Sequence, residues 1–361
     1  MVLSRRVRRY AKVLQQRCTV RFVPLCGLLL VVFVAPLRNT LVPGWPHVYR
    51  DMSTFKVICM YIQDLFFYVN TTPYDGECDF VHQGLATIRM PKLEEMATYD
   101  IQDWNRHMES IKDLLSEEEF DILDKFKPSM SVQEQKYIMY SMLSATQAMT
   151  AFNITYIVRG GSLIGYYRHH GRMPWDEDVD ILVNSAQWEL ARVVLSCLPD
   201  LQINLGNEYM WKLFHKDSQL WRNEKFIKFP YVDIFLYRED SESVWPLTIW
   251  MKLITMRKDW ALPPSKGIFE GWPIFVPNQP AKVISDLYPG RVMLDCYSQI
   301  FHRRKREPVA TKKRVVVPCS MLRGIYPLVV RRIENGMVIE ERTLGLRTLS
   351  TFKANYQGFF D

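Results

Sequence analysis

Three aspartates alternate with other residues just before an apolar run in the segment 160–183, GGSLIGYYRHHGRMPWDEDVDILV. Successive side chains of a β-strand point to opposite faces, so Asp178 and Asp180 would lie side by side on one face. Two carboxylates that close repel each other, and burying them beside the apolar VDILV run is costly unless a cation lies between them. The segment therefore predicts a partly buried strand whose acids bind a positive partner.

The spacing of the aspartates narrows the identity of that partner. A solvated acidic surface is a common alternative for three aspartates in five residues, and it stays open here. A calcium-binding EF-hand loop also begins D-x-D-x-D, but it requires glycine at the next position, where Ile181 stands. Carboxylate oxygens are ligands that Mg²⁺ and Mn²⁺ prefer, so we expect one of these two cations at Asp178 and Asp180.

Strand and helix patterns alternate around the aspartates. Further strands are expected at ITYIVRG (154–160) and at FPYVDIFLY (229–237), and the second of these carries a single acid, Asp233. A helix is expected from about Ser185 to Leu198. Farther on, two β-like runs flank Asn335-Gly336, a strong hairpin signal. This order predicts a mixed α/β or α+β core sheet with flanking helices and a β-rich C-terminal extension.

A long helix is expected ahead of the first strand, over residues 131–152. Ser131 and Glu134 form a capping box at its start. Its apolar stripe, which we assign to the core, consists of Tyr137, Ile138, Met142, Leu143 and Met149.

A glycine pair joins the first strand to the next helix. Gly161 and Ser162 stand at the expected N-terminus of the helix GSLIGYYRHHG, residues 161–171. Unpaired backbone N–H groups and the helix dipole favour an anion at such a position. We therefore predict that Gly161 and Ser162 bind a phosphate.

The positive charge of the chain is concentrated at its N-terminus. The formal net charge is +7, and residues 1–21 contain seven of the 46 basic residues and no acid. The remainder carries 39 basic residues against 39 acidic ones, so it is neutral. A nucleic-acid-binding protein would carry its excess charge on the folded domain, so we expect no nucleic-acid partner.

An uncharged run, FVPLCGLLLVVFVAPL (22–37), follows the basic tail. Its sixteen residues would span roughly 24 Å as a helix, a length suited to the thinner membranes of the early secretory pathway. Positive charge on the N-terminal side predicts a cytosolic tail, a single type II signal anchor and a lumenal location for everything beyond it. A cleaved signal peptide is the alternative. We therefore expect a membrane protein of the Golgi or endoplasmic reticulum.

Cysteines and glycosylation acceptors fit a lumenal location. Five cysteines lie beyond the anchor, and an odd number leaves at least one free or paired between chains. Asn70 and Asn153 begin N-x-T tripeptides and are predicted N-glycosylation sites. The expected organisation is a tail (1–21), an anchor (22–37), a stem with a helical region (38–128), a catalytic domain (129–300) and a basic loop with a β-hairpin extension (301–361).

The glycine turn, the paired aspartates and the lone strand acid together resemble the nucleotidyltransferase fold. Within that fold, the segment 160–181 is similar to the signature of the LicD/fukutin family, and the resemblance runs from about Ser131 to Gly290. The signature residues present here are Gly161, Leu163, Gly165, Arg168, His169, Gly171, Pro174, Trp175, Asp176, Asp178 and Asp180. Glu177 and the shifted residues around the last matching segment, FEGWPIFVPNQPAKVISDLYPG, depart from the family pattern.

The resemblance implies a phosphotransferase that moves a phosphorylated alcohol, of the phosphoribitol or phosphocholine type, from a CDP-activated donor to a glycan or glycoprotein. Asp178 and Asp180 would hold the metal ions, and Asp233 would complete the metal site or accept a proton. Asp176 would be an accessory ligand. Trp175, also in the signature, is expected to be a packing anchor.

Two basic residues of the signature helix are candidates for binding the donor phosphate. Arg168 could clamp it through a bidentate fork, and His169 or His170 could donate a hydrogen bond to it. The alternative for Arg168 is a salt bridge to Asp176 that orders the loop, and for each histidine a structural role.

Two competing functions stay open on sequence grounds. A Golgi glycosyltransferase would need only a D-x-D manganese site, and it does not require Asp233 beside the pair. A non-catalytic lumenal binding protein of the same fold would need no metal site at all.

Overall fold

The computed structural model describes residues 54–354 except 65, 66, 208, 223, 249, 250, 252, 253 and 289. The predicted tail (1–21) and anchor (22–37) lie outside the described residues. No helix in the part that is described is long and apolar enough to cross a membrane. The anchor, the type II orientation and the compartment therefore stay predictions.

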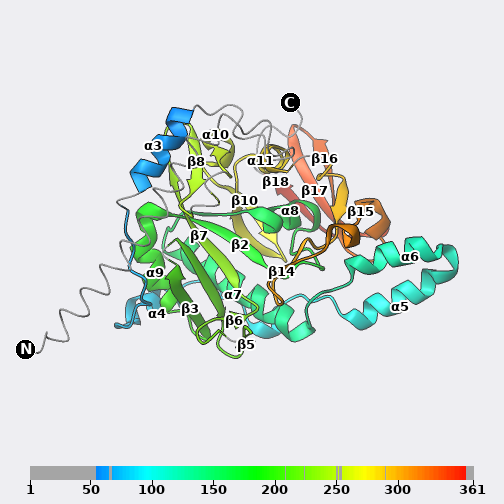
Figure 1. Ribbon diagram of the computed structural model, residues 1–361, viewed down its shortest axis with the longest axis horizontal. Helices are drawn as coiled ribbons and strands as arrows, with labels where there is room; N and C mark the ends of the chain where they lie inside the picture. Colours follow the sequence, from blue (N-terminus) through cyan, green and yellow to red (C-terminus); the bar gives the residue numbers. More distant parts are fainter. Residues whose placement is uncertain are drawn as a thin grey trace, which may run out of the picture.

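A mixed β-sheet forms the centre of the molecule, which confirms the predicted α/β class (Figure 1). Its strand order is β1-β2-β7-β4-β3, and β8 and β9 extend it beyond β7. The strands β2 and β7 run parallel, whereas the other paired strands of this sheet are antiparallel. The strand bounds are β1 Tyr156–Val158, β2 Val179–Asn184, β3 Leu201–Asn207, β4 Met210–His215, β7 Val232–Glu239, β8 Ser243–Pro246 and β9 Met256–Arg257.

The predicted long helix is α7, Val132–Ala151, and it packs against β4 and β7. Both hydrogen bonds of the capping box between Ser131 and Glu134 are present. Four members of the predicted apolar stripe are buried, and the fifth, Tyr137, stacks on the His215 ring. The stripe therefore belongs to the core, as predicted.

The predicted elements around the aspartates are present with small shifts. Helix α8 spans Gly160–His169 and connects β1 to β2. The helix expected from Ser185 begins with a 3-10 turn, Ser185–Gln187, which leads into α9, Trp188–Ser196. The other helices are α3 Thr54–Asp64, α4 Asp79–Leu85, α5 Ile101–Ile111, α6 Glu117–Leu123, α10 Lys258–Ala261 and α11 Pro280–Leu287.

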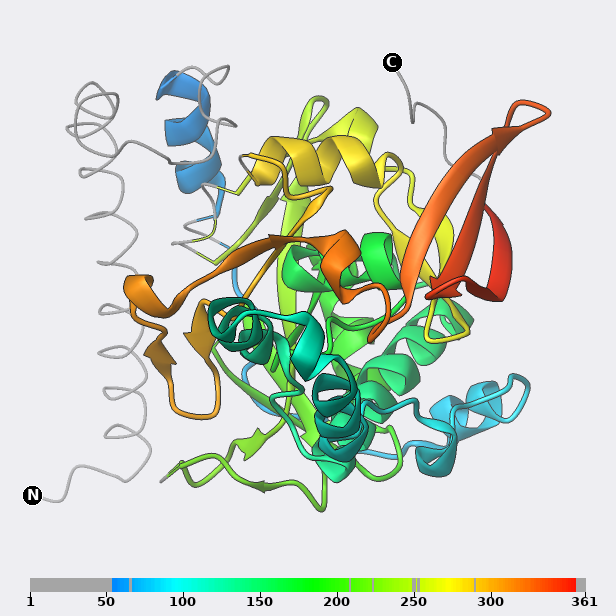
Figure 2. The same ribbon diagram turned by 90° about the vertical axis from the view of Figure 1, so that its right-hand side faces the viewer.

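Small sheets surround the central one. Their two-stranded pairs are β5 Gln219–Leu220 with β6 Lys228–Phe229, β10 Ser265–Phe269 with β11 Trp272–Val276, β12 Asp295–Tyr297 with β15 Val316–Pro318, and β13 Phe301–His302 with β14 Glu307–Pro308. Figure 2 shows the segment that carries β12 to β15, in orange, crossing in front of the central strands. This crossing brings residues from beyond position 290 over the aspartates.

The C-terminal hairpin is confirmed as β16, Leu328–Glu334, and β17, Met337–Leu344, joined at Asn335-Gly336. Both turn residues have positive φ, which suits an Asn-Gly hairpin turn. A third strand that the sequence analysis did not predict, β18 (Arg347–Ala354), pairs with β17. The resulting sheet contacts α8 through β16.

A second hydrophobic core joins three distant parts of the sequence. Trp104 and Phe126 from the N-terminal helical region pack there with Trp175 of the signature and with Tyr326. The disulfide Cys296–Cys319 lies in the same core, and a second disulfide links Cys78 to Cys197. Cys59 is the free cysteine among the described residues, in keeping with the odd count.

Candidate active site

The register of two parallel strands brings the three predicted metal-binding acids together. Asp178 directly precedes β2, Asp180 lies within β2, and Asp233 is its register partner on β7. Each acid offers a carboxylate oxygen within 4.8 Å of those of the other two. Asp178 and Asp233 are buried, and Asp180 is half-buried. The strand acid 53 residues downstream of Asp180 is thus part of the same cluster.

The start of α8 lies directly against these acids. Gly160 has a φ of +61°, and a Cβ at that position would lie 2.4 Å from Asp180 Oδ2. A Cβ on Gly161 would lie 2.7 Å from Asp176 Oδ2. The glycine pair therefore allows a backbone approach that side chains would block. The Ser162 hydroxyl accepts a hydrogen bond of 2.9 Å from the Asp180 N–H, which ties the helix to β2.

Burial raises the pKa values of three acids at the site, Asp176, Asp180 and Asp233. Burial, followed by the charge of Asp178, raises the pKa of Asp180 to about 7. The same two causes raise the pKa of Asp176 well above its usual value. Burial also raises the pKa of Asp233, although Lys212 counteracts this effect. Each shift expresses the cost of holding several carboxylates in one desolvated place.

The donor set fits a hard divalent cation. Its three carboxylates are the oxygen ligands that Mg²⁺ and Mn²⁺ prefer. Asp180 Oδ1 is buried and has no hydrogen-bond partner in the described part of the chain. Two basic groups form ion pairs with the cluster: Arg303 pairs with Asp178, and Lys212 Nζ lies 2.5 Å from Asp233 Oδ1. Neither of these two side chains donates a hydrogen bond to Asp180 Oδ1, so a bound metal ion would satisfy this buried oxygen.

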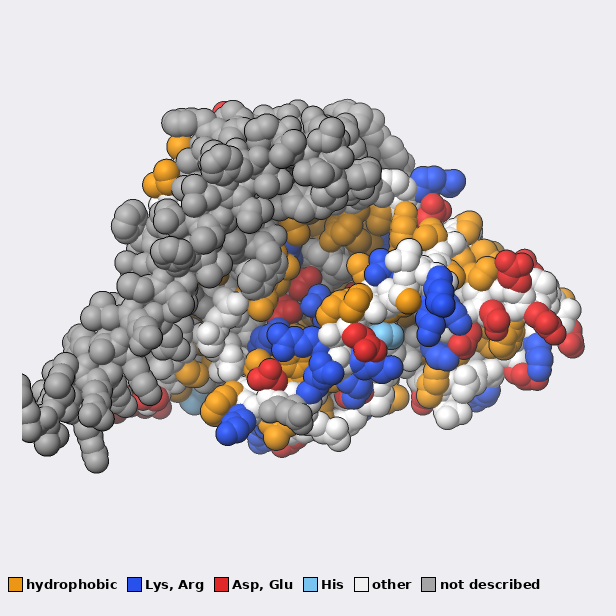
Figure 3. Space-filling model, viewed as in Figure 1, with side chains coloured by type: hydrophobic (Ala, Val, Ile, Leu, Met, Phe, Trp, Pro, Cys, Tyr) orange, Lys and Arg blue, Asp and Glu red, His pale blue; other side chains and the backbone are white. Residues whose placement is uncertain are grey.

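Two cavities meet at the acid cluster. The first, of about 440 Å³, contains Asp178 and Asp180 and is lined by the start of α8 and by aromatic residues that include Tyr288 and Tyr297. The second, of about 490 Å³, contains Asp233 and Lys212. Three residues line both cavities: Met251, Phe301 and Arg303. Figure 3 shows acidic side chains inside a hollow whose lower rim carries lysine and arginine.

The structure places the two predicted phosphate-binding groups at the end of α8 in different surroundings. The Arg168 guanidinium borders the first cavity but donates to the Asp295 carbonyl at 2.9 Å and to both sulfurs of the Cys296–Cys319 disulfide. Burial lowers its pKa to about 10. No ion pair joins it to Asp176 among the described residues, so the alternative salt bridge is not formed.

His169 lies away from both cavities. It is fully buried, and its Nδ1–H donates to the Pro327 carbonyl at 2.8 Å. The neighbouring His170 Nε2 lies 2.8 Å from Glu340 Oε2 on β17. His170 therefore contacts the C-terminal sheet and His169 contacts the residue just before it, and a contact of His169 with the donor phosphate stays a prediction.

The remaining signature residues divide between packing and the site. Trp175 packs edge-to-face on Phe126 and donates to the Tyr297 carbonyl at 3.0 Å, in keeping with a packing anchor. Asp176 lines the first cavity beside Asp178 and Asp180, and its role as an accessory ligand stays a prediction. Ser162 is buried and its hydroxyl is bonded to the Asp180 N–H, whereas Gly161 lines the first cavity.

Three basic residues at the site were missed by the sequence analysis. Arg303 belongs to the predicted basic loop, for which the sequence analysis assigned no role in the site. Lys212 interrupts the apolar strand MWKLFH, and such a buried lysine is itself a signal of an acidic partner. Arg159 precedes the glycine pair and lowers the pKa of Asp180. None of these could be assigned before the chain crossings were known.

The predicted glycosylation acceptors lie in loops. Asn70 is half-buried and accepts hydrogen bonds from the Thr72 N–H and hydroxyl. Asn153 lies in the turn between α7 and β1 with a φ of 53°. Their glycosylation stays a prediction.

Comparison with known proteins identifies the segment that carries the site. Residues 153–279 match the family described as "LicD/FKTN/FKRP, nucleotidyltransferase domain". This segment is a LicD-type domain. A lipopolysaccharide cholinephosphotransferase, LicD of Haemophilus influenzae, is 31% identical over 61 residues, which cover 17% of this chain and 23% of that protein. All three clustered acids and the α8 glycines fall inside the LicD-type domain, whereas Arg303 and the C-terminal sheet lie beyond it.

Proposed function

We propose that this chain is a metal-dependent phosphotransferase that moves a phosphorylated alcohol from a CDP-activated donor to a hydroxyl of a glycan. The observation that supports it most is the position of Asp233, within metal-binding distance of Asp178 and of Asp180, the acid against which the start of α8 lies. The LicD-type domain and the similarity to a cholinephosphotransferase support the same reaction class.

The proposed step is a single displacement at phosphorus. The acceptor oxygen attacks the phosphorus that carries the alcohol, and the bond from that phosphorus to the bridging oxygen of CMP breaks. CMP leaves with the electron pair, and the hydroxyl proton passes to a carboxylate, for which Asp233 is the candidate. Mg²⁺ or Mn²⁺ held by Asp178 and Asp180 would neutralise the charge on the phosphates, and Asp233 would either complete that metal site or accept the proton.

The two cavities suggest where the substrates bind. The first has the start of α8, whose N–H groups favour phosphate, together with Tyr288 and Tyr297, which could stack on the cytosine. We assign it to the donor. The second contains Asp233, the candidate base, and we assign it to the acceptor hydroxyl. Tyr166 and Tyr167 of α8 do not line the first cavity, so we do not assign them to stacking on the cytosine.

The glycosyltransferase alternative explains fewer of the observations. A D-x-D site needs Asp178 and Asp180, but it leaves both Asp233 and the close approach of Gly160 to Asp180 without a purpose. A non-catalytic binding protein has no need to keep three crowded acids, whose burial is costly.

We further propose that the reaction takes place in the lumen of the Golgi or endoplasmic reticulum. The two disulfides fit an oxidising compartment, and the predicted anchor would hold the catalytic domain on the lumenal side. A glycan or glycoprotein acceptor fits the same compartment.

The test is metal-dependent release of CMP by the purified full-length chain in detergent. CDP-ribitol, CDP-choline, CDP-glycerol and nucleotide sugars are offered in turn, beside an Asp180→Ala control. We expect CMP from one CDP-alcohol and none from the control. Activity with a nucleotide sugar alone would establish the glycosyltransferase instead. If calorimetry shows binding of neither Mn²⁺ nor CDP, the non-catalytic binding protein is favoured.

A further inference from the structure

The turn between β13 and β14 places Arg303 against the acid cluster. Its guanidinium forms an ion pair with Asp178, and its charge lowers the pKa values of Asp180 and Asp233. Burial lowers the pKa of Arg303 itself, but the nearby acids raise it by more. The Arg303 guanidinium thus pairs with a carboxylate, that of Asp178, which would otherwise be available to bind the metal ion.

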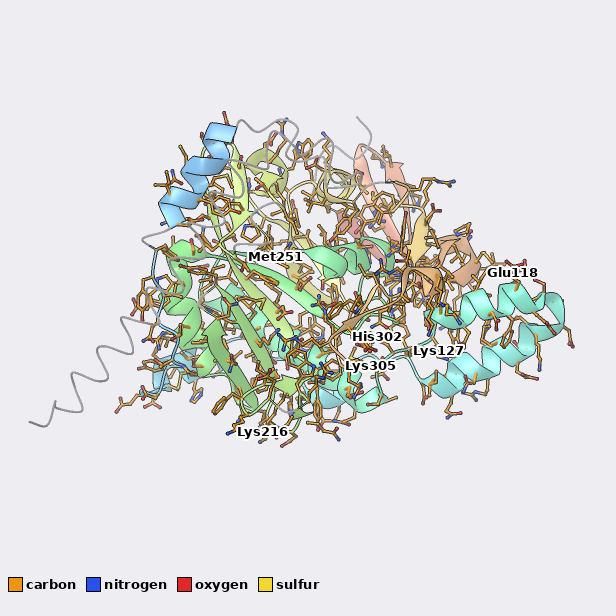
Figure 4. The ribbon with its side chains drawn as sticks, in the orientation of Figure 1. Glu118, Lys127, Lys216, Met251, His302 and Lys305 are labelled. Carbon is orange, nitrogen blue, oxygen red and sulfur yellow. A yellow bond between two sulfur atoms is a disulfide. The ribbon has the colours of Figure 1, made fainter. Side chains whose placement is uncertain are left out.

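Contacts that do not involve this ion pair hold the turn in place. The Trp221 indole donates to the Arg303 carbonyl at 3.0 Å, and the Arg304 N–H donates to Glu177 at 3.1 Å. The Arg304 guanidinium lies 2.5 Å from Glu134, the capping residue of α7. Figure 4 shows the neighbouring His302 and Lys305 on this segment. The Arg303 side chain can therefore change its partner while its backbone stays fixed.

Arg303 also lies where the two cavities join. It lines both of them, and 35% of its side chain is exposed, whereas only 9% of the Asp178 side chain is. A phosphoryl group that passes from a donor in the first cavity to an acceptor in the second must cross this junction. A planar guanidinium there can hold two phosphate oxygens in a bidentate fork.

We propose that Arg303 is a phosphate-binding residue with two partners. Without substrate, its guanidinium pairs with the Asp178 carboxylate. When a divalent cation binds that carboxylate, the guanidinium binds the diphosphate of the donor instead. The arginine keeps the crowded acids neutralised before binding and supplies positive charge to the phosphates afterwards. This inference rests on the proposed function and extends it to a residue outside the LicD-type domain.

The first test measures Mn²⁺ binding without substrate, by calorimetry on the full-length chain in detergent. Arg303→Gln removes the competitor from Asp178, so we expect a dissociation constant about tenfold lower than that of the unmodified protein. Lys305→Gln is the matched control. It removes one positive charge from the same turn, but its partner is Glu307 at 4.0 Å rather than a site acid. It should leave the affinity for Mn²⁺ unchanged.

The second test measures CDP binding in saturating Mn²⁺. Arg303→Gln should weaken CDP binding about tenfold. Arg303→Lys keeps the charge but not the bidentate fork, so its affinity for CDP should lie between those of Arg303→Gln and the unmodified protein. Opposite effects of one substitution on Mn²⁺ and on CDP cannot come from loss of folding, which would weaken both.

The outcomes separate the two proposals. If the unmodified chain binds Mn²⁺ and CDP but Arg303→Gln binds both equally well, the role of Arg303 is wrong and the proposed function stands. An equal gain in Mn²⁺ affinity for Lys305→Gln would reduce the effect to general charge and also overturn the inference. If the unmodified chain binds neither probe, the proposed function itself fails.

Discussion

Asp180 lies between Asp178, two residues before it in sequence, and Asp233, its partner on the parallel strand. Its pKa of about 7 means that the carboxylate is only partly ionised at neutral pH while the metal is absent. A cation bound there would favour the ionised form of all three acids. The crowded carboxylates of the site therefore lower the stability of the metal-free protein, and a bound metal ion would offset this cost.

Replacing Asp180 by Asn should separate the effect of this carboxylate on the stability of the metal-free protein from its effect on metal binding. The amide keeps the shape but removes one of the repelling charges, so we expect the metal-free protein to unfold with a free energy equal to that of the unmodified protein or about 1 kcal/mol higher. Mn²⁺ should raise the melting temperature of the unmodified protein and not that of the variant.

Asp217→Asn, at an exposed acid outside the cluster, serves as the control and should respond to Mn²⁺ like the unmodified protein. A large loss of stability in metal-free Asp180→Asn would contradict the prediction.

Gly160 offers a second prediction at this scale, because a matched glycine exists elsewhere. Gly160→Ala would strain a positive φ and crowd Asp180, whereas Gly271→Ala would strain a φ of +81° with nothing within 4 Å of its Cβ. Each should lose about 1 kcal/mol from the backbone. Only Gly160→Ala should also lose affinity for Mn²⁺ in calorimetry. Equal Mn²⁺ affinities in the two variants would show that the close approach is not needed for metal binding.

Helix α8 is the element that connects the metal site to the rest of the molecule. Its first turn is tied to β2 through Ser162, and its last turn is tied to the C-terminal segment through His169 and His170. His169 is fully buried, and burial followed by the charge of Arg168 lowers its pKa to about 3. It is therefore neutral in the folded protein at every pH near neutrality.

This neutral histidine predicts a loss of stability in acid. An unfolded histidine has a pKa of about 6.5, so between pH 6.5 and 3 the unfolded chain binds one more proton at this residue than the folded chain. Stability from His169 is then complete above pH 6.5 and falls by about 1.4 kcal/mol for each pH unit below it.

His169→Gln removes this proton-linked contribution. Urea unfolding should show the unmodified protein more stable at pH 7.5, with its advantage about 1.4 kcal/mol smaller at pH 5.5. Parallel stability curves for the two proteins over this range would contradict the prediction.

At the scale of the whole molecule, the C-terminal part of the chain packs against the N-terminal helical region and against α8. The second hydrophobic core packs Trp104 and Phe126 against Trp175 and Tyr326, and the sheet of β16 to β18 binds the end of α8. Glu340 on β17 is fully buried between His170 and Arg331, with an ion pair of 2.7 Å to the latter. The LicD-type domain thus depends on residues beyond its matched boundaries.

Removal of the Glu340 carboxylate tests this dependence. Glu340→Ala takes away a fully buried carboxylate that pairs with Arg331 and His170, so we expect a loss of about 3 kcal/mol in the free energy of unfolding. Glu341→Ala, at the next residue of the same strand, removes a surface pair with Arg332 and should leave stability nearly unchanged. Denaturant titration of both variants checks the difference, and equal losses would show that the contact with α8 contributes little.

Much of the site follows from local patterns. The alternation of Asp178 and Asp180 before an apolar run requires a strand with acids on one face, and the glycine pair requires a tight entry into a helix. The capping box of α7 and the Asn335-Gly336 hairpin are equally local, because each rests on hydrogen bonds or dihedral angles of adjacent residues. These features could be predicted because neighbours in sequence are neighbours in space.

Contacts between distant segments could not be predicted in this way. The sequence by itself determined the mixed α/β class, the aspartate strand and the lone acid Asp233 as a candidate partner. Only the tertiary structure decided that Arg303 pairs with Asp178, that Lys212 faces Asp233, and that Arg168 and His169 contact the C-terminal segment. The physical reason is that the register of parallel strands and the path of the chain over the sheet depend on packing across the whole core, which no local pattern encodes.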